Sequence, residues 1–331
     1  MPSHLAARLT AAFGEPVEDP DEETFLLYAR PMPSQDLGFV DPRAAVLEVP
    51  VRGRDYTIHQ SPSVLASSRA GGTTGAGAPL AGDPLFASWL AGSDNNPILP
   101  LLRPRPSVVE LGCGISPLCA LALRPLVSSY LLTDQPYVQR LVAQNLAANP
   151  PPASSSSFSS PPTPPLTPLL HLLTSPPRRQ NEQHAVEAQA RQQGQSSSST
   201  AIPHGTSFDA VLACDCVFNY ALVAPFVQTC ADVCALRASE SRVATSSSSS
   251  DDNGRGHHSR PGDAGEDAAD PCLCIVAQQL RNDDVFLEWL RAFSDKFRVW
   301  RVPEDVLPEG LRPDDGFVVH VGVLKEDHEQ Q

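Results

Sequence analysis

The stretch Val108-Val-Glu-Leu-Gly-Cys-Gly-Ile-Ser-Pro-Leu118 decides the fold that this sequence predicts. Apolar residues run directly into two glycines, and an apolar helical pattern follows as far as Val127. This order is typical of a buried strand, a glycine turn and a helix. The backbone at such a turn passes close beneath a ligand, and a side chain would block that approach. We therefore expect a nucleoside-binding turn here.

Asp134 gives a second sign of a nucleoside site, because it ends the apolar run Leu131-Leu-Thr-Asp134 twenty residues after Gly114. A carboxylate at the tip of the second strand accepts hydrogen bonds from both ribose hydroxyls. A dinucleotide fingerprint needs a third glycine where Pro117 stands, and the absence of Gly-Lys-Ser/Thr excludes a P-loop. We expect an adenosine-type cofactor. The alternative is a strand-to-helix turn of an α/β protein that binds no ligand.

Strand and helix patterns alternate along the chain. Residues 46–51 and 56–60 predict a β-hairpin, and residues 84–90 predict a helix that would form a lid over the cofactor. Further strands are expected at 108–111, 130–133, 208–215 and 272–277, each followed by a helix, at 117–127, 136–148, 221–236 and 283–293. Residues 297–302 and 317–324 would close the sheet as an antiparallel hairpin. This order predicts an α/β fold with one mostly parallel sheet.

The 34 prolines and the serine tracts mark segments that do not follow these patterns. We expect residues 151–206 and 239–270 to be disordered insertions, because their composition offers little to pack into a core. The predicted organisation is an N-terminal extension at 1–45, a single domain at 46–324 that contains both insertions, and a tail at 325–331.

The formal net charge is −14, so the basic footprint of a nucleic-acid-binding protein is absent. An acidic surface suits a basic protein partner, although it also serves solubility alone. We find no apolar run of the roughly 18 residues that a membrane span needs, and no apolar signal-peptide core at the N-terminus. We expect a cytoplasmic protein, with the nucleus as the alternative, and no membrane partner.

Eight cysteines raise the question of a metal site or of disulfides. Two pairs stand one residue apart in strand-like runs, and Cys230 and Cys234 would share one face of a helix. The sequence shows no matched partner pair that would complete a zinc pattern. We therefore expect buried free thiols and no metal.

A second strand tip carries an acidic residue, in Ala213-Cys-Asp215-Cys-Val-Phe218-Asn-Tyr220. Ligands bind outside such tips in open α/β sheets. The Asp-x-x-Phe/Tyr sequence here resembles the signature of the lysine-targeting branch of the seven-strand methyltransferases. This resemblance implies that Asp215 steers an amine and that Phe218 and Tyr220 line its channel, because a cation favours a carboxylate and aromatic walls. The alternatives are that Asp215 caps the next helix and that Phe218 fills core.

Two further groups of residues allow more than one interpretation. Gln278, Gln279 and Arg281 follow another strand tip, where they would either touch a substrate or solvate a loop and cap the next helix. His320 lies among valines in the closing strand, so we expect a core histidine rather than a catalytic base.

Four longer phrases together resemble one known family: Thr133-Asp-Gln-Pro-Tyr-Val138, Ala213-Cys-Asp-Cys-Val-Phe-Asn-Tyr-Ala-Leu222, Cys274-Ile-Val-Ala-Gln-Gln-Leu-Arg281 and Gly316-Phe-Val-Val-His-Val-Gly322. They are similar to the fungal ribosomal lysine N-methyltransferase 5 family, a branch of the methyltransferase-like 21 group. The resemblance covers roughly residues 45–150, 207–238 and 271–324. The Glu-Leu-Gly-Cys-Gly and Asp-x-x-Phe motifs agree with it.

This resemblance implies the Rossmann-like seven-stranded methyltransferase fold, S-adenosyl-L-methionine as cofactor, and methylation of a lysine. The implied partner is a basic large-subunit ribosomal protein of the L1 type, bound by a monomer that makes no direct contact with nucleic acid. The residues expected at the reacting amine are Asp215, Phe218 and Tyr220. Those expected at the cofactor are Glu110, Gly112, Cys113, Gly114, Asp134, Gln135, Ala213 and Cys214.

The chain departs from this family in two places. Relatives carry a tryptophan soon after the segment that matches Thr74-Gly-Ala76, whereas the next tryptophan here is Trp89. Relatives also end the third strand in a Leu-Asp-Trp-like sequence, for which the nearest candidate is Leu169-Leu-His-Leu-Leu173. Two other functions therefore stay open: a methyltransferase for a small molecule or RNA, and a binding protein that has lost activity. The acidic charge counts against RNA.

Overall fold

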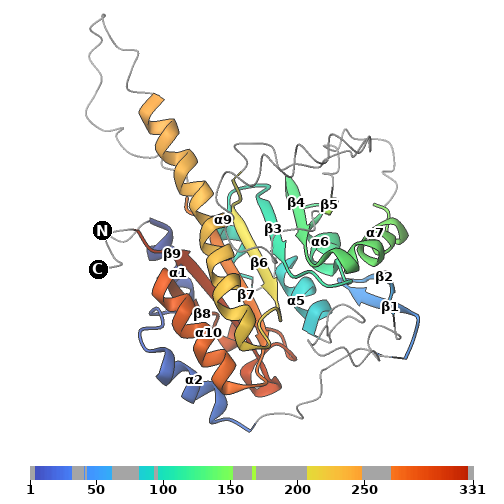
Figure 1. Cartoon of the computed structure of the whole chain (residues 1–331), viewed down its shortest axis with the longest axis horizontal. Helices are drawn as coiled ribbons and strands as arrows, with labels where there is room; N and C mark the ends of the chain where they lie inside the picture. Colours follow the sequence, from blue (N-terminus) through green and yellow to red (C-terminus); the bar gives the residue numbers. More distant parts are fainter. Residues whose placement is uncertain are drawn as a thin grey trace, which may run out of the picture.

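Figure 1 shows the computed structural model of the chain, which describes residues 4–31, 41, 43–61, 82–92, 96–151, 166–168, 207–247 and 270–326. The α-helices are α1 (His4–Phe13), α2 (Pro20–Tyr28), α5 (Gly82–Leu90), α6 (Leu118–Leu123), α7 (Gln139–Ala148), α9 (Tyr220–Ser247) and α10 (Asp283–Lys296). The strands are β1 (Val46–Val51), β2 (Arg54–His59), β3 (Ser107–Leu111), β4 (Ser129–Thr133), β5 (Leu166–Pro168), β6 (Ala210–Cys214), β7 (Leu273–Gln279), β8 (Phe297–Arg301) and β9 (Phe317–Leu324). Short 3-10 helices are η1 (Leu99–Leu101), η2 (Pro136–Val138), η3 (Glu304–Val306) and η4 (Pro313–Asp315).

The central sheet has seven strands in the order β5-β4-β3-β6-β7-β9-β8. Strands β5, β4, β3, β6 and β7 are parallel, and β9 runs antiparallel to both β7 and β8. The chain moves from β3 outward to β5 and then restarts at β6 on the other side of β3. The predicted Rossmann-like α/β fold, with a seven-stranded sheet and a closing antiparallel hairpin, is confirmed.

Helices cover both faces of this sheet, because alternate strand residues point to opposite sides. Val109 and Leu111 belong to the core that α9 and α10 cover, together with Leu27 of α2. Val108 points to the opposite face, as does Glu110. It belongs to the core that α1, α5, α6 and α7 cover. Figure 1 shows α9 and α10 lying side by side across one face of the sheet.

Several elements differ from the sequence prediction. The expected N-terminal extension contains α1 and α2, whose Leu5, Leu9 and Leu27 are buried in the core. The insertion expected at 151–206 contains β5, whose Leu166 pairs with Tyr130 of β4, because the backbone can extend a sheet whatever the composition around it. Helix α9 continues eleven residues beyond the predicted end at 236, through a segment with alanine, arginine and glutamate, which favour a helix. The Thr74-Gly-Ala76 and Leu169–Leu173 segments lie outside the described residues.

The first part of α9 corrects the expectation that no segment has the length and composition of a membrane span. Among the described helices, Tyr220–Ala238 alone is long and apolar enough, with a mean hydropathy of 1.3. Its apolar residues Val223, Phe226 and Val227 are buried in the core beside the sheet. The packing of this face of the helix against the sheet accounts for part of its apolar composition, although only 39% of the apolar window is buried.

The hairpin β1–β2 forms a separate two-stranded sheet that α7 holds against the main fold. Asn145 Oδ1 accepts from His59 N at 2.7 Å, and its Nδ2 donates to His59 O at 3.0 Å and to Ile115 O at 2.7 Å. One turn later, Asn149 makes the same pair of bonds with the backbone of Thr57, at 2.9 and 2.8 Å. The side-chain amides of the two asparagines therefore pair with the free edge of β2 through the backbone groups that a neighbouring strand would use.

We expect Asn145→Ala to lower the free energy of unfolding by about 3 kcal/mol, because it leaves one buried and two partly buried backbone groups unpaired. Gln144→Ala is the matched control, since Gln144 is exposed on the same helix, and it should change stability by less than about 0.5 kcal/mol. Urea denaturation of the three proteins measures the difference. Equal midpoints would show that the asparagine bonds contribute nothing.

Candidate active site

The glycine turn between β3 and α6 lies where the strand order reverses, at the carboxyl ends of the parallel strands. Gly112 and Gly114 have φ values of +71° and +57°, in the region that favours glycine. The amides of Gly112 and Cys113 both donate to Thr133 O, at 2.9 and 3.1 Å. A Cβ on Gly112 would lie 2.6 Å from Cys216 Sγ. The turn is therefore held by β4 on one side and by the β6 tip on the other.

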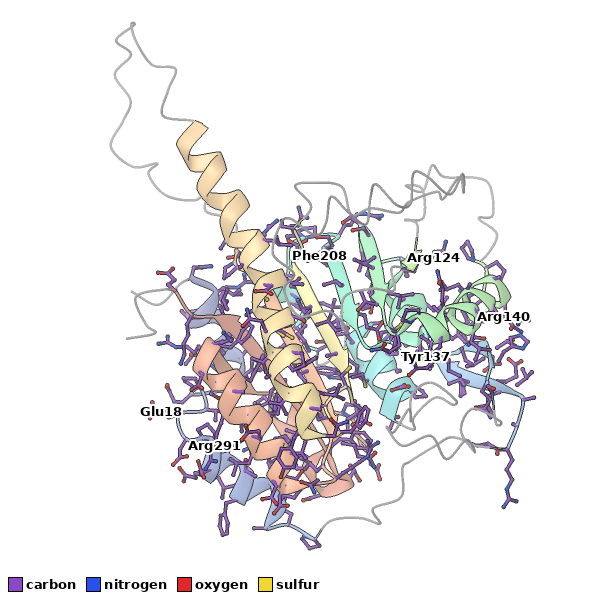
Figure 2. The ribbon with its side chains drawn as sticks, in the orientation of Figure 1. Glu18, Arg124, Tyr137, Arg140, Phe208 and Arg291 are labelled. Atoms are coloured by element: carbon purple, nitrogen blue, oxygen red, sulfur yellow. The ribbon has the colours of Figure 1, made fainter. Side chains whose placement is uncertain are left out.

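Asp134 lies directly against this turn. Its Oδ2 accepts from Gly114 N and its Oδ1 from Gln135 N, both at 2.6 Å. Burial raises the pKa of Asp134, and the two amides oppose that rise without cancelling it. Ser116 Oγ is buried beside the turn without a hydrogen-bond partner among the described residues. Tyr137, labelled in Figure 2, is 56% exposed just after this carboxylate.

Glu110 is held inside the core. Its Oε2 accepts from the Tyr130 hydroxyl at 2.8 Å, and its residue is only 4% exposed. Burial raises the pKa of Glu110 to about 8, and the charges of Asp83 and Asp134 add to the rise while Tyr130 opposes it. Glu110 is therefore largely protonated at neutral pH. Its side chain accepts a hydrogen bond from the Tyr130 hydroxyl and not from a backbone amide of the glycine turn.

Ala213 and Cys214, also expected at the cofactor, end strand β6. Ala213 is fully buried. Cys214 Sγ lies 3.5 Å from Asp83 Oδ1, at the start of α5. The predicted lid helix thus contacts the β6 tip through its first turn, and its role as a lid stays a prediction.

A small pocket with a cavity volume of about 30 Å³ opens on the other side of the β6 tip. Asp215 and Val217 line it, while Cys216 between them points to the glycine turn, with Sγ 2.8 Å from Leu111 O. Asp215 has φ +51°, a left-handed conformation that aspartate tolerates better than most residues. The other lining residues are Tyr28, Phe218, Gln278, Gln279, Arg281, Asn282, Val285 and Phe286.

Asp215 forms an ion pair inside this pocket, with Oδ2 2.5 Å from Arg281 Nη2. Its Oδ1 accepts from Gln279 N at 3.4 Å. Burial raises the pKa of Asp215 to about 6, although the charge of Arg281 and the Gln279 amide oppose the rise. The group is therefore mainly a carboxylate at neutral pH. These contacts join it to the end of β7 and the link that follows, and not to α9 as a helix cap.

The structure brings one of the two predicted aromatic residues to this pocket. Phe218 is half-buried and lines it, so it does not fill the core. Tyr220 is 58% exposed and is not among the lining residues. Tyr28 and Phe286 supply the other aromatic walls, with ring centroids 5.7 Å apart. No pattern of residues pointed to their role, because they come from α2 and α10, far from Asp215 along the chain.

One buried ion-pair cluster and one exposed ion pair hold α2, and with it Tyr28, in place. Glu23 Oε1 lies 3.1 Å from His320 Nε2, and Glu23 Oε2 lies 3.2 Å from Arg301 Nη1. Burial would raise the pKa of Glu23, but the bond to His320 and these positive charges outweigh it and lower the pKa. Arg291 of α10, labelled in Figure 2, pairs with Asp21 of α2. The prediction that His320 is a core residue is confirmed.

The cysteines lie mainly in the core, and all eight are free. Cys230 of α9 lies against Cys274, and Cys234 of α9 lies against Cys272, as buried free thiols. Burial raises the pKa of the Cys230 and Cys274 thiols. In the described part of the chain, no group of three or more His, Cys, Asp or Glu side chains is arranged to hold a metal ion.

Comparison with known proteins gives limited likenesses. No family model matches the chain. A diaminohydroxyphosphoribosylamino-pyrimidine deaminase of Schizosaccharomyces pombe is 29% identical over 139 residues, which is 40% of this chain and 32% of that protein. The chain thus matches about a third of the length of this curated relative. The zinc-deaminase pattern His-x-Glu followed by Pro-Cys-x-x-Cys does not occur in the present sequence.

Several solved methyltransferase structures also overlap with the chain. A putative SAM-dependent methyltransferase from Streptococcus mutans is 7% identical, with a TM-score of 0.39 over 85% of this chain and 56% of that one. The N-methyltransferase NodS from Bradyrhizobium japonicum, in complex with S-adenosyl-L-homocysteine, is 8% identical, with a TM-score of 0.33 over 67% and 80% of the two chains. The fold assignment itself rests on the strand order of this protein.

We expect Glu110→Gln to change how stability depends on pH. The unfolded carboxyl ionises near pH 4.5 and the folded one near pH 8, so wild-type stability falls as the pH rises between these values. Glutamine cannot ionise and still accepts from Tyr130. The variant should gain stability relative to wild type from pH 5 to pH 8, at up to about 1.4 kcal/mol per pKa unit. Urea unfolding at both pH values measures this.

The control is Glu309→Gln at an exposed site, whose stability should depend on pH as that of the wild type does. The same pH dependence for Glu110→Gln and wild type would contradict the interpretation of Glu110 as a buried acid.

Gly112→Ala should destabilise the protein more than Gly53→Ala. Both glycines have positive φ, but a methyl group added at Gly112 would meet Cys216 Sγ at 2.6 Å, whereas nothing lies within 4 Å of one added at Gly53. We expect about 1 kcal/mol for Gly53→Ala and about 3 kcal/mol for Gly112→Ala. Thermal unfolding compares them, with Gly112→Ala/Cys216→Ala expected to recover part of the loss. Equal losses at both glycines would argue against close packing at the turn.

Proposed function

We propose that this chain is an S-adenosylmethionine-dependent protein-lysine N-methyltransferase whose substrate is a basic protein, a large-subunit ribosomal protein of the L1 type. The observation that carries the proposal is the Asp215 pocket. Cys216, the residue after Asp215, lies against the glycine turn, where the strand order reverses. Ligands of open α/β sheets bind at this position. The resemblance of the sequence phrases to a lysine methyltransferase family supports the choice of substrate.

The residues at the turn fit this cofactor. Gly112 and Gly114 allow close approach of the backbone, and Ser116 Oγ is a buried polar atom without a partner among the described residues. Asp134 would hold the ribose hydroxyls, with Gln135 beside it. When bound, S-adenosylmethionine supplies a methyl group on a positively charged sulfur. The exposed ring of Tyr137 stands next to Asp134 and offers an aromatic surface where the expected tryptophans are absent.

The pocket suits an amine. Asp215 is mainly ionised at neutral pH and would accept a hydrogen bond from the lysine nitrogen, which orients it for attack. The rings of Tyr28, Phe218 and Phe286 form walls that favour a cation and exclude water. These residues orient the amine; its proton leaves to solvent or to a group of the substrate.

The surroundings of the pocket favour a basic protein over RNA. The charges of Asp283, Asp284 and Glu288 act on Tyr220, and that of Asp283 also acts on Tyr28 at the pocket. Acidic groups at the rim would repel a phosphate backbone and attract a basic segment. The net charge of −14 acts in the same direction.

A methyl-transfer assay with labelled donor and ribosomal extract tests the proposal. We expect label on a lysine of an L1-type protein, reduced at least about 100-fold in Asp215→Asn, since the variant keeps the size but loses the charge that orients the amine. Calorimetry should show that Asp215→Asn still binds the cofactor and that Gly112→Arg does not. Asp295→Asn, at an exposed position of α10, serves as the control with full activity.

The other outcomes separate the alternatives. Label in RNA or in a small molecule would replace the lysine proposal with another methyltransferase activity. Absence of both label and cofactor binding in the wild-type protein would favour a binding protein that has kept only the fold.

A further inference from the structure

Arg281 occupies the position at Asp215 that a substrate cation would take. Its Nη2 lies 2.5 Å from Asp215 Oδ2, and the side chains of the pair are 17% and 6% exposed. Nε and Nη2 of Arg281 also donate to Gln279 Oε1, at 3.0 and 2.7 Å. A positive group belonging to the protein is thus already held on the carboxylate inside the pocket.

We propose that Arg281 is a specificity-determining residue that leaves Asp215 when the substrate ammonium enters, so that the carboxylate exchanges one cation for another. This inference rests on the proposed function, because it takes the pocket as the lysine site. Its consequence is selectivity: a neutral or anionic side chain cannot replace the guanidinium without leaving a buried charge unpaired.

The local backbone allows this exchange without unfolding. Arg281 lies in the short link between β7 and α10, and the residues on both sides are fixed independently of its side chain. Leu280 N donates to Gly316 O at 2.7 Å, and Asn282 Oδ1 caps α10 by accepting from Val285 N at 2.9 Å. The guanidinium is partly exposed and can therefore turn outward while the link keeps its conformation.

Two buried polar atoms in the pocket support the arrival of a ligand. Asp215 Oδ2 is paired with the charge of Arg281 but has no aligned hydrogen bond, and Gln278 Nε2 has no partner among the described residues. Both residues are at least nine-tenths buried and both line the pocket. A lysine in a peptide offers what each lacks, since its nitrogen donates and its main-chain carbonyls accept.

The displaced guanidinium has carboxylates close by. Asp283 follows Arg281 by two positions in the chain, and its charge reaches Tyr28 at the pocket wall. Asp284 and Glu288 are four residues apart and so share one side of α10, and their charges reach Tyr220. The Arg281 guanidinium can therefore leave the buried Asp215 carboxylate and pair with these acidic residues in solvent. This second pairing limits the free energy that binding of the ammonium has to supply.

Binding of n-butylammonium, a lysine side-chain analogue, tests the exchange by NMR titration. Arg281→Met removes the competing charge and keeps an unbranched stem, so we expect its affinity for the probe to rise roughly 5- to 10-fold. Arg281→Lys keeps a cation and should stay within about twofold of wild type. In Arg281→Met/Asp215→Asn the gain should disappear. Unchanged thermal unfolding and a second variant, Arg281→Gln, guard against a folding defect.

Two results would overturn the inference: equal affinity of wild type and Arg281→Met for the probe, or weaker binding by both Arg281→Met and Arg281→Gln. Methyl transfer, measured in parallel, keeps the two proposals apart. If the wild type labels lysine but Arg281→Met does not change the affinity for the probe, only the proposed displacement of Arg281 from Asp215 is wrong. A gain in probe affinity without lysine labelling would sink only the proposed function.

Discussion

The carbonyl of Thr133 receives two amide hydrogen bonds, from Gly112 and Cys113, and the site depends on this interaction. It joins the end of β4 to the turn after β3, so that Asp134 comes to lie against Gly114. On the other side the turn is closed by Cys216 Sγ, which leaves no room for a side chain at Gly112. The strand order reverses at this point, with the glycine turn on one side of the β6 tip and the Asp215 pocket on the other.

Burial favours the neutral form of each buried acidic group near the site, and the partners of each group oppose that effect to a different degree. Glu110 has only a hydroxyl as its partner, and its pKa rises to about 8. Asp215 is just as buried but has a guanidinium beside it, and its pKa rises only to about 6. Glu23, with His320 and Arg301 next to it, has a lowered pKa. Partners rather than depth therefore decide which carboxyl groups carry charge at neutral pH.

Most strands and helices could be predicted, because their apolar periodicity reflects which face each buries. The exceptions are α1 and α2, which lie in the segment expected to be an N-terminal extension, β5, a three-residue edge strand inside a Pro/Ser-rich segment, and the end of α9, where helix propensity outlasts the apolar pattern. At the site, Asp215 and Phe218 followed from their place after a strand. Tyr28 and Phe286 did not, because α2 and α10 reach the pocket only through tertiary packing, and Tyr220 turned outward to solvent.

The sequence by itself determined the glycine turn, its acidic neighbour Asp134 and the acidic tip at Asp215, since these depend on short-range spacing and on the rule that parallel strands end at one edge of a sheet. Only the tertiary structure decided the partners of those groups. Arg281 on Asp215, Tyr130 on Glu110 and the asparagines of α7 on β2 join segments that are distant along the chain. Such contacts depend on which faces meet in the core, and local patterns of residues carry no information about that pairing.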